Sequence, residues 1–134
     1  MKKAFLLSLF IFCYCIILNA ATFTVTKVAD TNDGTCDGDC SLREAIVAAN
    51  AAGGTNTVVV PAGTYTLTLS AQLDITTNMT IDGAGESTTI IEAATTANTA
   101  DWRVFAVTGA NTDVIFEDVT IRHGDTFNAG GGNA

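Results

Sequence analysis

The chain has 134 residues, with 14 acidic and 6 basic side chains and a formal net charge of −8. This length suits a single domain. Nucleic acids and anionic lipid surfaces repel an acidic protein, so the charge argues against both as partners. The single proline and the few long charged side chains, with abundant Thr, Ala, Asn and Gly, favour a β-rich fold with little helix.

Residues 1–20 have the pattern of a secretory signal peptide. Two lysines precede an uncharged, apolar run that ends near Leu18, and Ala20 is the small residue that a signal peptidase requires. The run is shorter than the roughly 20 apolar residues of a membrane-spanning helix. We therefore expect cleavage after Ala20, no membrane insertion afterwards, and a protein that is secreted or held on a bacterial cell surface. Cleavage leaves 4 basic residues against 14 acidic ones, so the mature charge is 4 − 14 = −10.

The mature chain opens with a predicted strand and an acidic loop. Apolar and polar residues alternate over residues 22–28, and residues 30–39 contain four Asp and two Gly. Signal cleavage removes two of the four cysteines, which leaves Cys36 and Cys40. Two cysteines in an exported chain are most simply one disulfide, here a structural link across the loop.

A short helix follows the loop, from Ser41 to about Ala51. Ser41 and Glu44 have the spacing of a capping box, in which each side chain bonds the backbone N–H of the other residue. The apolar residues then fall on one face of the helix: Leu42, Ala45, Ile46 and Ala49. A helix of this length is not stable alone, so we expect its apolar stripe to cover another element.

Only short strands are predicted from residue 57 onward, separated by Gly, Asn, Asp and Thr. The segments 78–82 and 118–122 resemble each other at an offset of 118 − 78 = 40 residues, which suggests two coils of about twenty residues in a stacked solenoid. A meander of antiparallel hairpins is the alternative, although no two-residue Asn-Gly or Asp-Gly turn joins two alternating strands. The expected inward positions are Val58, Val60, Leu67, Leu69, Ile75, Ile81, Ile91, Phe105, Val107, Val119 and Ile121.

Residues 40–45 read CSLREA, the signature that names the CSLREA domain. The chain also resembles that family in the AIVAAN stretch that overlaps this signature and in the PAGTYTL stretch at 61–67, so the resemblance covers roughly residues 22–69. It implies a large exported bacterial surface protein in which this domain precedes a single-stranded, right-handed parallel β-helix of the pectate-lyase-like type. It carries no catalytic activity or catalytic residue with it.

The resemblance divides the chain into three parts. Residues 1–20 are the signal peptide, residues 21–56 are the N-terminal strand, disulfide loop and capping helix, and residues 57–134 begin the β-helix. The glycine-rich residues 130–134 resemble a turn between coils, so we read the chain as the N-terminal part of a longer protein. The expected function is a non-enzymatic N-terminal cap and first coils of an adhesin-like or scaffold protein, whose extracellular carbohydrate or protein ligand the sequence does not define.

The alternative function is the N-terminal part of a β-helix polysaccharide lyase or hydrolase. Its catalytic residues would lie beyond residue 134. The triplets at 111–113 (NTD) and 122–124 (RHG) echo motifs of polygalacturonase-type hydrolases, but the chain has no Asp-Asp pair between them. Arginine, the basic residue available in the strand region, holds its proton too tightly to act easily as a base.

The acidic loop also permits a calcium hypothesis. Asp33, Asp37, Asp39 and Glu44 fall at ligand-like positions of an EF-hand-type loop, with glycine at the sixth position. Against this hypothesis, a strand rather than a helix precedes the loop, and Glu44 is already the capping-box acid. The favoured interpretation is a capped turn with a solvated acidic loop and no cofactor.

Overall fold

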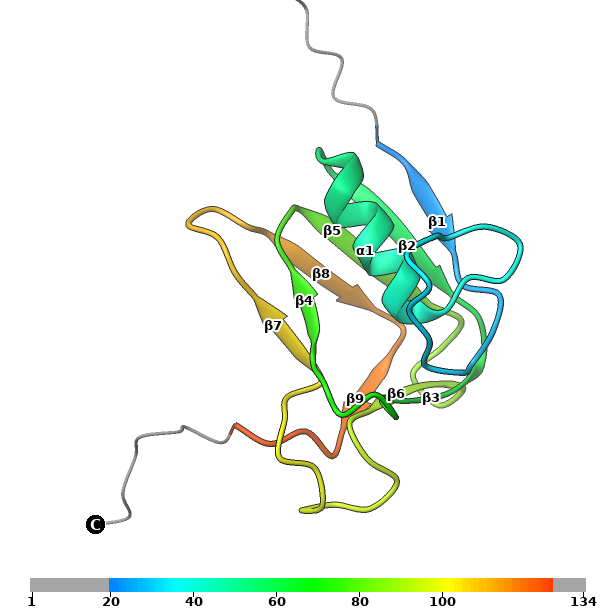
Figure 1. Cartoon of the computed structure of the whole chain (residues 1–134), viewed down its shortest axis with the longest axis vertical. Helices are drawn as coiled ribbons and strands as arrows, with labels where there is room; N and C mark the ends of the chain where they lie inside the picture. The colour runs from blue at the N-terminus through cyan, green and yellow to red at the C-terminus, as the bar shows by residue number, and fades with distance from the viewer. Residues whose placement is uncertain (1–19, 127–134) are drawn as a thin grey trace, which may run out of the picture.

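The computed structural model describes residues 20–126, which form one helix and nine strands (Figure 1). The signal segment up to residue 19 and the predicted turn at 130–134 lie outside the described residues. The helix is α1 (Leu42–Ala52), and the strands are β1 (Thr22–Thr24), β2 (Asn56–Val60), β3 (Gly63–Thr66), β4 (Leu73–Ile75), β5 (Met79–Gly83), β6 (Thr89–Glu92), β7 (Phe105–Val107), β8 (Val114–Glu117) and β9 (Thr120–Arg122).

All strand pairings in the described part of the chain are parallel, and they form three sheets. The sheet orders are β1-β2-β5-β8, β3-β6-β9 and β4-β7. From β2 onward, consecutive strands belong to the first, the second and the third sheet in turn. One passage of the chain through all three sheets is a circuit, and each complete circuit adds one strand to each sheet. The predicted β-rich fold of short strands is confirmed, and the strands are parallel. The antiparallel meander is wrong for the described strands.

The first strand is shorter than predicted because the backbone after it forms hydrogen bonds with the acidic loop. The strand expected over residues 22–28 ends at Thr24. The Val25 N–H still donates to Val59 O at 2.9 Å, but the Thr26 N–H turns to Cys40 O at 2.8 Å. The acidic loop thus redirects the chain after one short strand.

The repeat of about twenty residues inferred from the echo at residues 78–82 is close to the first circuit, from Asn56 to Met79 (79 − 56 = 23 residues), but wrong for the second, from Met79 to Val114 (114 − 79 = 35 residues). Met79 pairs with Val114 one circuit later, rather than with Val119 two circuits later. Val119 lies between β8 and β9, and β9 pairs with β6 in a different sheet. The circuits have unequal lengths because the turn between β6 and β7 spans residues 93–104, whereas only residues 67–72 separate β3 from β4.

The core lies inside the three sheets and continues under α1. Six of the eleven expected inward residues are buried: Val58, Val60, Leu67, Ile75, Ile81 and Ile91. Phe105 and Val119 are partly buried. Leu69, Val107 and Ile121 are exposed, which corrects the prediction. Leu69 lies beyond the end of β3, where the alternation of the strand no longer applies, whereas Val107 and Ile121 lie on the last strands of their sheets.

Candidate functional site

The start of α1 contains both hydrogen bonds of the predicted capping box. The Glu44 N–H donates to Ser41 Oγ at 3.2 Å, and the Ser41 N–H donates to Glu44 Oε2 at 2.7 Å. The Ser41 hydroxyl in turn donates to the carbonyl of Thr31 at 2.7 Å. The cap therefore satisfies the first turn of the helix and also holds the acidic loop against it.

Glu44 is the centre of this network. Its Oε1 accepts the Thr31 hydroxyl at 2.9 Å and the Asp33 N–H at 3.1 Å, and Lys27 Nζ lies 3.7 Å from Oε2. The side chain is fully buried. Burial alone would raise the pKa of Glu44, but the hydrogen bonds from Ser41, Asp33 and Thr31 favour the charged form and lower the pKa to about 2.

Arg43, the neighbouring residue of the motif, links the loop to the first circuit of strands. Its guanidinium pairs with both oxygens of Asp30, at 2.7 and 3.0 Å. Its other N–H groups donate to the carbonyls of Gln72 and Ala71, at 2.9 and 2.8 Å, just before β4. Sequence reasoning assigned Arg43 no role, although an arginine inside a capping box and an aspartate at the start of the loop are a recognisable pair for such a contact.

The disulfide between Cys36 and Cys40 is confirmed. Cys40 is buried, and its N–H donates to Thr26 Oγ1 at 2.7 Å. The disulfide closes the end of the acidic loop directly before the helix, so it fixes where Ser41 meets the loop.

The apolar stripe of α1 is buried against β1, β2 and β4, as expected of a helix that covers another element (Figure 1). Ile46 is 1% exposed, whereas its neighbour Val47 is 41% exposed. Asn56, the first residue of β2, donates from Nδ2 to the carbonyls of Ala49 and Gly53, at 2.8 and 2.9 Å. These contacts satisfy the last turn of the helix, where Gly53 has a φ of 64°.

The four carboxylates of the calcium hypothesis do not converge on one point. Within residues 20–126, no group of three or more His, Cys, Asp or Glu side chains is placed to hold a metal ion. Asp33 and Asp37 each accept the backbone N–H two residues further on, at 2.9 Å, and Asp39 pairs with Lys27 at 3.0 Å. Glu44 is occupied by the cap. The oxygens of this loop act in local turns and in the capping network.

A second buried acid lies on the strands and was missed by sequence reasoning. Glu92 Oε1 accepts the Thr66 hydroxyl at 2.8 Å, and Oε2 accepts Arg122 Nε at 2.8 Å. His123 Nδ1 lies 3.6 Å from the same Oε2 and 2.8 Å from the carbonyl of Ala94. Burial would raise the pKa of Glu92, but these partners lower it. The signal was the register, because Thr66, Glu92 and Arg122 occupy one column of parallel strands.

Comparisons with protein-family models, with curated proteins and with solved structures find no match for this chain. Within residues 20–126, no helix is long and apolar enough to cross a membrane.

Proposed function

We propose that this chain is the N-terminal cap and the first coils of an exported, right-handed parallel β-helix protein of the CSLREA type. The observation that carries the proposal is that the segment before β2 contacts all three sheets at the same end of the stack. β1 pairs with β2 in the first sheet. Val28 lies against β3 in the second, since a methyl group at Gly63 would come within 2.8 Å of Val28 Cγ1. Arg43 holds the carbonyls just before β4 in the third.

The physical need for such a cap follows from the fold. The first circuit of a stack of parallel strands has no preceding circuit, so its apolar interior and the free edge of each strand would face water. The stripe of α1 that includes Ile46 covers the interior, while the polar network around Glu44 satisfies the backbone of the covering loop. An apolar inner face and a polar outer face are typical of the terminal repeat of a stacked-repeat protein.

The role is structural in this proposal, and the protein works outside the cytoplasm. The signal-like residues 1–20 support export. The buried acids also support a structural role, because the carboxylates of Glu44 and Glu92 each accept several hydrogen bonds from other residues of the chain. The proposed whole protein is an adhesin-like or scaffold protein that contacts an extracellular carbohydrate or protein.

The test is a matched pair of substitutions on α1. Ile46→Asp places a charge on the buried face of α1 and should destabilise the protein by about 4 kcal/mol or more. Val47→Asp, on the adjacent exposed position, should change stability by less than about 0.5 kcal/mol. Urea unfolding followed by the fluorescence of Trp102, the single tryptophan, reports the effect on the second circuit. Equal stabilities of the two variants would contradict the proposed cap.

The milder Ile46→Ala keeps the comparison informative if the charged variant does not fold, and it should cost about 2–5 kcal/mol. Export is tested by N-terminal sequencing of the extracellular protein. The expected first residue is Ala21, and an intact Met1 on exported material would contradict the signal peptide.

A further inference from the structure

The end of the stack opposite α1 is apolar and uncovered by the described residues. Three inward columns that are buried in one circuit are exposed on the last strand of their sheet, namely those that end at Val107, Phe116 and Ile121, whereas Phe105 and Val114 remain partly buried. Ile81 is 0% exposed, but Phe116, its partner one circuit later, is 37% exposed. Ile91 is likewise buried, and its partner Ile121 is 42% exposed. Inward-facing apolar residues thus continue onto the last strand of each column, which no later strand of the described chain covers.

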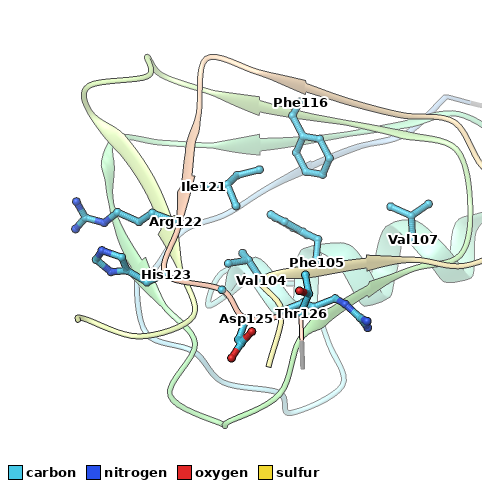
Figure 2. A pocket seen from close by; sticks show the side chains of 11 residues that line it. Val104, Phe105, Val107, Phe116, Ile121, Arg122, His123, Asp125 and Thr126 are labelled. Carbon is cyan, nitrogen blue, oxygen red and sulfur yellow. The ribbon is translucent and has the colours of Figure 1, made fainter. Parts of the chain in front are cut away.

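These side chains surround one groove. Phe105, Phe116 and Ile121 come from three different sheets and point toward one another, as Figure 2 shows. The rings of Phe105 and Phe116 lie 4.9 Å apart between centroids. The groove has a volume of about 530 Å³. Within the described chain β7, β8 and β9 each pair on one edge only, so backbone donors and acceptors line the groove together with apolar side chains.

Two basic side chains lie at the rim of the groove. Residues 20–126 contain four basic side chains, of which Lys27 and Arg43 are held in ion pairs of the cap. The other two, Arg103 and Arg122, are among the residues around the groove, as is Asp125, and the Arg122 side chain points away from the centre of the groove (Figure 2). Arg122 uses Nε and Nη2 on the same oxygen of Glu92, and its side chain remains 42% exposed. A guanidinium has five N–H donors, so Arg122 can still bind an acidic residue in the next position of its column.

We infer that this end is a docking surface for a further coil of parallel strands that continues the chain. This inference rests on the proposed function, and it adds the chemistry of the partner. The coil pairs with the free edges of β7, β8 and β9, places apolar residues over the columns of Phe116 and Ile121, and places an acidic residue over Arg122. The path of the backbone favours a continuing coil over a second molecule. The Asp125 N–H donates to the carbonyl of Trp102 at 2.9 Å, which holds the chain leaving β9 beside the residues that lead into β7.

The chain contains a suitable probe in its own residues 73–92, because β4, β5 and β6 belong to the same three sheets, in the same order, as β7, β8 and β9. In register, that segment would place Ile81 over Phe116, Ile91 over Ile121 and Glu92 over Arg122. A variant that carries a second copy of residues 73–92 after the complete chain should therefore form one more circuit. Its melting temperature should exceed that of a variant with a scrambled extension of the same composition by at least about 5 °C. Binding of a hydrophobic dye should fall at least twofold.

Two further variants test the chemistry of the groove. Ile121→Asp in the extended chain should abolish the gain in melting temperature over the scrambled control. Replacing the appended copy of Glu92 by Lys should reduce the gain, and Arg122→Ala should remove the difference between the Glu and Lys extensions. If the native and scrambled extensions give equal melting temperatures, the inference is overturned. The cap is tested separately by Ile46→Asp in the unextended chain, so failure here leaves that result standing.

Sedimentation of the unextended chain tests the competing occupant. A monomer across the concentration range is expected. A dimer that dissociates on Ile121→Asp would identify a second copy of the chain as the occupant and would overturn the inference of a continuing coil.

Discussion

Replacing Glu44 by Gln removes one charge from the capping network while keeping the shape of the side chain. In the native protein the carboxylate accepts N–H groups from Ser41 and Asp33 and the hydroxyl of Thr31. A glutamine can accept through its oxygen alone, and its NH2 group would face one of these donors. The variant therefore leaves a buried donor without a partner and loses the charge-assisted bonds. At neutral pH we expect a loss of about 3 kcal/mol in the free energy of unfolding.

The pKa of Glu44 makes this loss depend on pH. The folded pKa of about 2 lies below the value of about 4.3 for an unfolded chain, so the native contacts favour the charged form. Their contribution is fully present above the unfolded pKa and is lost as the pH falls toward 2. It amounts to about 3 kcal/mol at pH 7 and falls to roughly 1 kcal/mol at pH 2.5. The difference between wild type and Glu44→Gln should shrink by the same amount.

Urea unfolding at a series of pH values between 7 and about 2.5 measures both quantities. Glu92 also has a lowered pKa, but it lies in a different network and contributes equally to both proteins, so it cancels in the difference. Asp37→Asn is the matched control, because Asp37 is an exposed loop acid that accepts one local N–H. It should leave stability unchanged at every pH. A difference between wild type and Glu44→Gln that stays constant with pH would refute the role given to the buried carboxylate.

Three other outcomes follow from the same network. Arg43→Lys keeps the charge but loses the two-point contact with Asp30, and urea unfolding should show a loss of about 2–3 kcal/mol; a change within error would mean that the contact contributes nothing. Replacing Cys36 and Cys40 together by Ser should cost about 2 kcal/mol, the value for closing so short a loop, and an unchanged unfolding midpoint would contradict this. Millimolar calcium should leave the melting temperature unchanged in wild type and in Asp37→Ala alike, whereas a saturable rise in wild type that Asp37→Ala abolishes would restore the calcium hypothesis.

The capping box at the start of α1 was predictable because its sequence signals are local. The spacing of Ser41 and Glu44 specifies a helix start whatever the rest of the chain does. The same spacing explains the weakness of the calcium hypothesis. A carboxylate can serve a cap or a metal, and Glu44 is fully used by donors from the loop. The bonds from Arg43 to the carbonyls of Ala71 and Gln72 could not be derived in the same way, because they depend on where the turn before β4 lies in space.

The stack was predictable in kind but not in detail. Short apolar segments separated by turn residues indicated strands, and period-two alternation identified the buried members of most columns. The length of a circuit could not be read from the same pattern, because each turn can hold a different number of residues without changing the register of the strands it joins. Met79 therefore pairs with Val114, although the sequence around residue 119 resembles it more closely.

The two ends of the stack of strands differ in chemistry, so the two ends cannot make the same contacts with another molecule. A head-to-tail contact between copies would need the apolar groove around Phe116 to meet the first circuit of another molecule. In that first circuit β1 pairs with the edge of β2, the apolar stripe of α1 covers the interior, and Arg43 holds the carbonyls just before β4. Stacked parallel strands that are open at both ends would extend from molecule to molecule as a filament. In the proposed function, the capping segment removes one of the two surfaces that such growth requires, and the inferred docking surface at the other end receives a single partner in a fixed orientation.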